Sequence, residues 1–208
     1  YEQNATPTLD PIGDLAIDED AAEQTVNLTS IGAGGSESQP LRVTSSSSIA
    51  GLIPDPTISY SSADSTGSLK FTPLGDQSGT ATITVTVEDG GIDGDLNTAG
   101  DNATFSRTFD VTVNAVNDLP LLDTPSNVVV DEDAAEQTVN LAGISAGGGE
   151  SQPLQVTASS SDTGLIPDPA VTYTSADTTG TLKVTPVSDQ SGTATITVTV
   201  EDGGLDND

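Results

Sequence analysis

Acidic side chains are the residues of this sequence best suited to chemistry, and they recur at fixed places. The stretch DEDAAEQTVNL occupies residues 18–28 and again, letter for letter, residues 131–141. Each copy opens with three acids in a row, and Asp131 lies 113 positions after Asp18. Two carboxylates about 4 Å apart repel by roughly 1 kcal/mol in water, and more at lower dielectric. A hard divalent cation reverses the sign of that energy, so metal binding is the chemistry that these residues favour.

The composition excludes several classes of protein. The 208 residues include 32 acids against 4 Lys and Arg, which gives a formal charge of −28, and there is no Cys or His. Disulfides, zinc sites of the usual kind and Cys or His nucleophile-base pairs are therefore excluded, and we expect no enzyme. Nucleic acid and anionic membranes are unfavourable partners for so acidic a chain. We find no signal peptide and no apolar run of membrane-spanning length, so we expect an internal piece of a longer chain.

The repeat predicts two tandem domains. Residues 51–56 match residues 164–169, and residues 76–91 are identical to residues 189–204, always with the same offset of 113. Such close copying indicates two units of one fold, and we place them at residues 1–116 and 117–208. Asp208 corresponds to Asp95, so the second domain lacks a counterpart of residues 96–113 and with it the final strand.

The hydrophobic pattern predicts an all-β protein. Residues 80–87 read TATITVTV, a strict alternation that puts four apolar side chains on one face and four threonines on the other. Similar patterns, parted by Gly, Pro, Asp and Ser, predict seven strands per complete unit. They lie at 15–17, 24–28, 40–45, 57–61, 68–72, 80–88 and 103–113. We therefore expect two tandem seven-stranded β-sandwiches in an elongated arrangement, the second without its last strand.

The acids fall at the turns between these strands, and alternate turns lie at opposite ends of a sandwich. One end of the first domain is predicted to collect Asp18, Glu19, Asp20, Asp55 and Asp76. The other end of the first domain is predicted to collect Glu37, Asp89, Asp93 and Asp95. The corresponding end of the second domain is predicted to collect Glu150, Asp202, Asp206 and Asp208. Domains joined end to end would bring acids of both to their junction. Calcium, which accepts six to eight oxygen ligands in adaptable geometry, suits such scattered ligands better than magnesium does.

A second candidate for calcium is the stretch DGDLNTAGD at residues 93–101. Asp93, Asp95 and Asn97 are spaced two apart, with Asp101 behind them, which resembles the start of an oxygen-ligand calcium loop. The terminal Glu of such a loop is missing.

Several stretches resemble the cadherin-like and Ig-like tandem repeats of large bacterial surface or secreted proteins of adhesin type. They are the residues around Glu19, those around Asp76, VEDGG at 87–91 and NAVNDLP at 114–120. The resemblance implies calcium between domains, with the carried-over ligands Glu19, Asp76, Asn117, Asp118 and Asp202. The sequence departs from the family at Ala115, at the Gly-rich GAGGSESQ of residues 32–39 and at Ala5, which stands opposite Asp118. One or two ions per junction are expected rather than three.

These observations predict a structural segment of an extracellular or cell-surface protein, a stalk or adhesive fibre that calcium stiffens. Its expected partners are neighbouring repeats of the same protein, possible self-association, and a cell-surface glycan or protein. Two alternatives stay open. The chain could be a glycan- or protein-binding module, or a filament protomer whose missing strand comes from a neighbouring chain.

Overall fold

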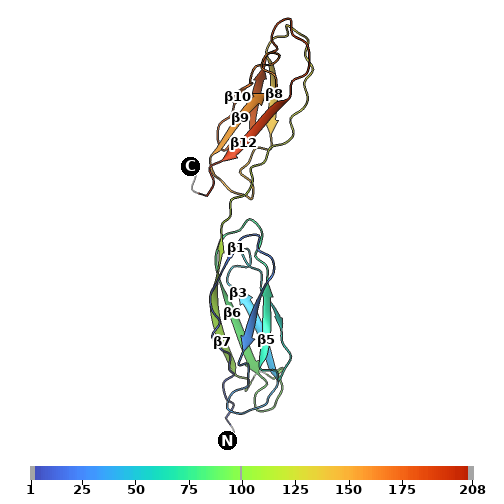
Figure 1. The fold of residues 1–208 in the computed structure, drawn as a ribbon. Coiled ribbons are helices and arrows are strands. Elements are labelled where there is room, and N and C mark those ends of the chain that lie inside the picture. Colours follow the sequence, from blue (N-terminus) through green and yellow to red (C-terminus); the bar gives the residue numbers. More distant parts are fainter. Residues whose placement is uncertain (1–2, 99, 206–208) are drawn as a thin grey trace. The chain divides into compact units, whose positions relative to one another are not determined.

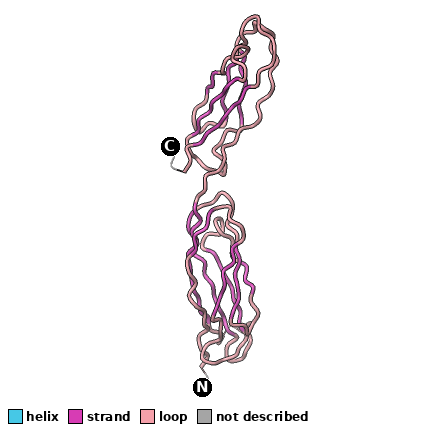
Figure 2. Tube along the Cα trace, viewed as in Figure 1, coloured by secondary structure: helices cyan, strands magenta, loops and turns pink. Residues whose placement is uncertain are grey.

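The structure is a computed structural model that describes residues 3–98 and 100–205. Throughout those residues it consists of strands and loops, with no helix (Figures 1 and 2). The all-β character predicted from the sequence is therefore confirmed. No helix in the described ranges could serve as a membrane span. Asp206 and Asp208, which were predicted to join an acidic cluster, lie outside the described residues.

The chain divides into two compact units, Tyr1–Val116 (unit 1) and Asn117–Asp208 (unit 2). Unit 1 contains two sheets. The first sheet has the order β1-β7-β6-β3 and the second has the order β2-β5-β4. The strands are β1 (Leu15–Asp18), β2 (Gln24–Thr29), β3 (Leu41–Ser47), β4 (Thr57–Ser59), β5 (Thr66–Phe71), β6 (Gly79–Asp89) and β7 (Thr104–Asn114).

The core of unit 1 lies between its two sheets, because each strand turns one face inward. Along β6 the inward side chains are Ala81, Ile83, Val85 and Val87, all 0% exposed, while threonines alternate with them. Leu28 and Leu69 from the second sheet belong to the same buried cluster. Side chains of both sheets thus close one apolar interior, as in a β-sandwich.

Strand β7 has a central place in the first sheet. It pairs antiparallel with β6 along nearly its whole length, from Gly79 opposite Val113 to Glu88 opposite Thr104. Its other edge pairs parallel with β1, from Leu15 opposite Val111 to Asp18 opposite Asn114. Strand β1 has no other partner, so it depends on β7 for its backbone hydrogen bonds.

Unit 2 contains five strands among the residues described. The sheets have the orders β12-β9 and β10-β11-β8. The strands are β8 (Gln137–Ala142), β9 (Leu154–Ser160), β10 (Ala170–Thr172), β11 (Thr179–Val184) and β12 (Ile196–Asp202). With the offset of 113 these are the counterparts of β2 to β6, and the described residues of unit 2 contain no counterpart of β1 or β7.

The differences between the units follow from the absence of a β7 counterpart among the described residues of unit 2. Residues 128–131 correspond to β1 and form no strand, because the partner that β1 has in unit 1 is absent from the described part of unit 2. Strand β12 begins at Ile196, whereas β6 begins four positions earlier in the equivalent numbering. Residues 79–82 of β6 pair only with β7, while Ile83 to Asp89 also pair with β3. Only the stretch with a second partner stays a strand in unit 2.

Candidate metal sites at the ends of each unit

The first acidic group of unit 1 lies where β1 and β7 end side by side. Glu19 follows β1 and its backbone N–H donates to the Asn114 carbonyl at 2.9 Å. The Glu19 carboxylate accepts the backbone N–H of Val116 at 2.7 Å, and the residue is only 7% exposed. Asn114 Nδ2 in turn donates to Asp18 Oδ1 at 3.2 Å. Glu19 is thus hydrogen-bonded to both Asn114 and Val116, and it holds the chain that follows β7 close to the end of β1.

Asp20 and Asp76 belong to the same end of unit 1, and both have left-handed backbones, with φ of 63° and 56°. Carboxylate oxygens of the two residues lie within 4.8 Å of one another. Both side chains are exposed, and neither has a basic residue as an ion-pair partner among the described residues. Asp tolerates the left-handed region better than most residues do, which fits acids to these tight turns. The counterparts Asp133 and Asp189 repeat the same backbone angles in unit 2.

A second group lies at the opposite end of unit 1, around Asn4. Asn4 Nδ2 donates to Asp89 Oδ1 at 2.9 Å, and Gln39 Nε2 donates to Asn4 Oδ1 at 2.8 Å. The backbone N–H of Ala5 donates to Glu37 Oε2 at 3.0 Å, and that oxygen also accepts from Gln39 at 3.2 Å. We call Asn4, Glu37, Gln39 and Asp89 the unit 1 network. It holds the leading segment of the chain against the ends of β3 and β6.

Unit 2 contains the same network, displaced by 113 positions, and we call it the unit 2 network. Asn117 Nδ2 donates to Asp202 Oδ1 at 3.2 Å and Gln152 Nε2 donates to Asn117 Oδ1 at 2.8 Å. The Asp118 N–H donates to Glu150 Oε2 at 3.1 Å, and carboxylate oxygens of Asp118 and Glu150 lie within 4.8 Å of one another. Asp118 adds a carboxylate where unit 1 has Ala5, so the second network has one more acid than the first.

A glycine-rich loop permits the leading segment to lie so close in both units. Gly34 has φ of 90°, and a Cβ on it would lie 2.2 Å from the Thr6 carbonyl oxygen. Gly147 has φ of 93°, and a Cβ on it would lie 2.3 Å from the Leu119 carbonyl oxygen. Any other residue would push the leading segment away. The Gly-rich stretch that departs from the cadherin pattern therefore has a packing role in this chain.

Buried oxygens without hydrogen-bond donors mark both networks. Asp89 is 0% exposed, and its Oδ1 accepts from Asn4, Gly91 N and Ala103 N, each at 2.9 Å. Its Oδ2 is buried and has no donor. The amide oxygens of Gln39 and Gln152 are likewise buried without a donor, while their amide nitrogens donate to Asn4 and Asn117. Buried acceptors usually have a partner, and a cation is one kind of group that fits them.

The acids of the loop at residues 93–101 accept hydrogen bonds from their own loop. Asp93 Oδ1 accepts the N–H of Asp95 at 2.9 Å, and Asp95 Oδ1 accepts the N–H of Asn97 at 2.9 Å. These local hydrogen bonds, chiefly from Asn97, hold the pKa of the exposed Asp95 carboxyl below its ordinary value. Asp101 Oδ2 accepts the N–H of Ile92 at 2.8 Å. The acids here support the turns of their own loop.

The predicted residues thus fall into groups within each unit. Glu19 and Asp18 share one end of unit 1 with Asp20 and Asp76, while Asp89 lies at the other end with Glu37. Asn117, Asp118, Glu150 and Asp202 lie together in unit 2. Sequence reasoning missed Asn4, Gln39 and Gln152. The signal for them was the offset itself, because Asn4 aligns with Asn117, and ESQP occurs at both 37–40 and 150–153.

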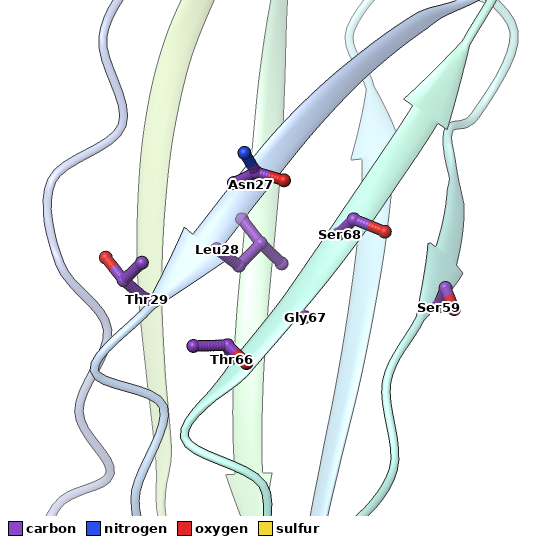
Figure 3. A pocket seen from close by; sticks show the side chains of 7 residues that line it. All are labelled: Asn27, Leu28, Thr29, Ser59, Thr66, Gly67 and Ser68. Carbon is purple, nitrogen blue, oxygen red and sulfur yellow. The ribbon is translucent and has the colours of Figure 1, made fainter.

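The hollow in Figure 3 lies over the sheet β2-β5-β4 of unit 1. It is lined by Asn27, Leu28, Thr29, Ser59, Thr66, Gly67 and Ser68. Its lining contains no titratable side chain and no aromatic ring. Small-molecule sites are usually lined by hydrophobic and aromatic side chains, and of this lining only Leu28 is a large hydrophobic residue.

Comparison with known proteins finds matches only among solved structures. No protein-family model matches the chain. No curated protein matches it. The human desmocollin-1 ectodomain is 14% identical with a TM-score of 0.40, over 99% of this chain and 36% of that chain. The titin domains Z1Z2 in complex with telethonin are 13% identical with a TM-score of 0.34, over 95% of each chain. Domains 1–6 of the surface layer protein SbsC are 19% identical with a TM-score of 0.34, over 98% of this chain and 27% of that chain.

Proposed function

We propose that this chain is a structural segment of an extracellular or cell-surface protein, built of tandem cadherin-like and Ig-like β-sandwich repeats whose ends bind calcium. The repeats act as a stalk or adhesive fibre. Calcium bound at the ends of the repeats restricts the motion of one repeat relative to the next. The internal repeat, the acidic composition and the position of the acids at strand ends support this proposal.

One observation carries the calcium part of the proposal. The same network of Asn, Gln, Glu and Asp side chains closes the leading end of both units, and in both it leaves a buried oxygen without a donor. In unit 1 these oxygens are Asp89 Oδ2 and Gln39 Oε1, and in unit 2 Gln152 Oε1. Carboxylate and amide oxygens are the ligands that calcium prefers. Asp89, Glu37 and Gln39 would hold the ion in unit 1, and Asp118, Glu150 and Gln152 in unit 2.

Glu19, Asp20 and Asp76 are the proposed ligands at the other end of unit 1. Two exposed carboxylates within 4.8 Å repel each other when no cation is near. Glu19 already fastens the segment after β7 through Val116, so an ion beside it would further restrict the chain that leads out of the unit. A lost ion would leave the acids to repel and would loosen that segment.

Differential scanning calorimetry of the full chain, in calcium and in chelator, tests the calcium part. A ligand that binds only the folded state stabilises it, by about 2.7 kcal/mol at a hundred times its Kd. We expect millimolar calcium to raise the melting temperature by several degrees, and magnesium to raise it less. Asp89→Asn and Glu19→Gln should each reduce this rise.

Asp64→Asn is the matched control, because Asp64 is an exposed turn acid and its side chain belongs to neither group of candidate ligands. It should keep the full calcium response. Equal melting temperatures in calcium and in chelator would reject calcium as a ligand. Small-angle scattering then tests the mechanical part. Calcium should narrow the range of arrangements of the two units that is needed to fit the measured profile. A calcium-bound chain that scatters like the chelated chain would leave binding intact and reject stiffening.

A further inference from the structure

The unit 1 network and the unit 2 network differ at one charged position. Ala5 follows Asn4 in unit 1, whereas the residue that follows Asn117 in unit 2 is Asp118. The other members of the two networks are of the same types. Asn4, Glu37, Gln39 and Asp89 align with Asn117, Glu150, Gln152 and Asp202. The internal repeat therefore presents one candidate calcium site twice, once without and once with an additional carboxylate.

A glycine makes room for the additional carboxylate. Gly148 has φ of 43°, and a Cβ on it would overlap Asp118 Oδ2 and lie 2.7 Å from Asp118 Cγ. Its counterpart in unit 1 is Gly35, with φ of 52°, where a Cβ would lie 2.9 Å from the Cβ of Ala5. Both loops thus leave space beside the leading segment. Only unit 2 fills that space with an acid.

The Asp118 carboxylate lies beside other oxygens of the unit 2 network. Its oxygens and those of Glu150 come within 4.8 Å of one another, and the Asp118 N–H donates to Glu150 Oε2 at 3.1 Å. Gln152 is 8% exposed, and its Oε1 is buried without a hydrogen-bond donor. The Nε2 of Gln152 donates to Asn117, the residue directly before Asp118. Two carboxylates and a buried amide oxygen are thus held by one short network.

The unit 1 network offers fewer charges to an ion at the same place. Glu37 Oε2 accepts the N–H of Ala5 at 3.0 Å, as Glu150 does for Asp118, but position 5 has no carboxylate. Calcium sites built of oxygen ligands bind more tightly when more of the ligands are charged. Two neighbouring carboxylates also repel each other without a cation, so unit 2 gains more from an ion than unit 1 does.

We propose that the residue at position 5 or 118 sets the calcium affinity of each network, so that the unit 2 network binds calcium at lower concentration than the unit 1 network. This inference rests on the proposed function and adds the order of binding and the residue that determines it. Between the two binding midpoints, calcium occupies the leading end of one repeat and not that of the other. The response of the chain to calcium is therefore graded.

The test is a calcium titration of the full chain, followed by nuclear magnetic resonance of backbone amides. The amides of Gly35 and Glu37 report on the unit 1 network, and those of Gly148 and Glu150 report on the unit 2 network. We expect the midpoint for the unit 2 amides at about tenfold lower calcium than that for the unit 1 amides.

Substitutions at the one differing position test its role directly. Ala5→Asp should lower the midpoint of unit 1 by about tenfold and leave that of unit 2 unchanged. Asp118→Ala should raise the midpoint of unit 2, and Asp118→Asn should do the same because it removes the charge while keeping the shape. Ser38→Asp is the matched control, since it adds the same charge to an exposed neighbour of Glu37. It should change the midpoint of unit 1 far less than Ala5→Asp does.

The possible results separate this inference from the proposed function. Equal midpoints in the wild type, or an unchanged unit 1 midpoint in Ala5→Asp, would overturn the inference even if calcium still raises the melting temperature. Amides that ignore calcium in both units, with equal melting in calcium and chelator, would reject the calcium function as well. If Asp118→Ala loosens unit 2, faster hydrogen exchange in β9 will show it, and Ala5→Asp in unit 1 then decides the question.

Discussion

At the scale of single residues, the repeat supplies natural comparisons in which the same position has different neighbours. Glu19 and Glu132 occupy equivalent places in identical stretches. Glu19 is 7% exposed and accepts the Val116 N–H, whereas Glu132 is exposed. The segment after β7 that supplies this N–H in unit 1 has no counterpart among the described residues of unit 2. The setting of an acid, rather than its local sequence, decides whether it is fixed in place.

Asp10 gives a residue-scale prediction about pH. The hydroxyls of Ser30 and Thr29 donate to Asp10 Oδ2 at 2.7 and 2.8 Å, and these hydrogen bonds, Ser30 first, hold the pKa of the carboxyl below its ordinary value. In the second copy the donors are replaced by Ala142 and Gly143. We expect Ser30→Gly to raise the pKa of Asp10 toward its ordinary value, measured by carboxyl ¹³C titration.

The sign of the stability effect follows from the direction of the shift. A lowered pKa in the folded state contributes stability above the unfolded pKa, and this contribution is lost as the pH falls through the folded pKa. The difference in stability between the wild type and Ser30→Gly should therefore shrink in acid. Ser30 has φ of 57°, which glycine adopts without strain, so the substitution leaves the backbone in place. An unchanged Asp10 titration in this variant and in Thr29→Ala would contradict the hydrogen-bond explanation.

At the scale of elements, the pair β6 and β12 allows one substitution to be made twice. Ile83 is 0% exposed and its strand lies between β3 and β7, whereas the identical Ile196 is half-buried and its strand has one neighbour, β9, in the described part of unit 2. Replacing a fully buried Ile with Ala costs about 2–5 kcal/mol, because apolar contacts are lost and a cavity forms. We expect Ile83→Ala to cost about 3 kcal/mol in unit 1, and Ile196→Ala about 1 kcal/mol in unit 2.

Native-state hydrogen exchange can measure the two costs separately in the full chain. Amides of β3 and β6 report on unit 1, and amides of β9 and β12 report on unit 2. The serine and threonine residues on the outer faces provide controls, since Thr84→Ala and Thr197→Ala should change exchange little. Equal costs for the two isoleucine substitutions would mean that β7 does not account for the deeper burial of β6.

Much of this element structure could be predicted from the sequence. The seven strands of unit 1 lie within about two residues of their expected bounds, because strict alternation and Gly, Pro and Asp turns act locally. The loss of β1 pairing in unit 2 was not predicted. Residues 128–131 read VVVD and favour a strand by propensity, yet pairing needs a partner that is remote in sequence. The propensity of a segment shows whether it can form a strand, but whether it pairs depends on the neighbouring strands of the sheet.

The candidate sites show the same division between local and remote information. The acids at turns could be found from sequence, since turn positions follow from the strands. The roles of Asn4, Gln39 and Gln152 could not, because an amide side chain at the end of a strand is common and the partners in these networks are 35 to 85 residues away. In the loop at 93–101 the ligand-like spacing could be found from sequence, and the hydrogen bonds that Asp93 and Asp95 accept from their own turns come from the structure.

At the scale of the whole molecule, charge is the dominant property. A formal charge of −28 on 208 residues raises the free energy of the compact state by self-repulsion. Screening shortens the reach of such repulsion, from about 10 Å at 0.1 M salt to about 3 Å at 1 M. We expect sodium chloride to raise the melting temperature of the chain in chelator, as measured by calorimetry.

A variant with fewer charges provides the control for this prediction. Asp64→Asn, Asp110→Asn and Asp177→Asn together remove three exposed acids without touching the candidate ligands. The combined variant should respond less to sodium chloride than the wild type does. A salt response that is equal in both proteins would point to a general effect of salt on apolar burial instead of screening.

The identity of β6 and β12 also makes the order of synthesis matter. A ribosome releases β7 before β12 exists, so β6 can capture β7 without competition. When a polypeptide that contains both copies is denatured and refolded, β6 and the identical β12 can compete for β7, and the wrong choice joins parts of the two copies. Duplicated sequence is thus safest when a chain folds from its beginning as it emerges, and refolding in the test tube exposes a misassembly that biosynthesis avoids.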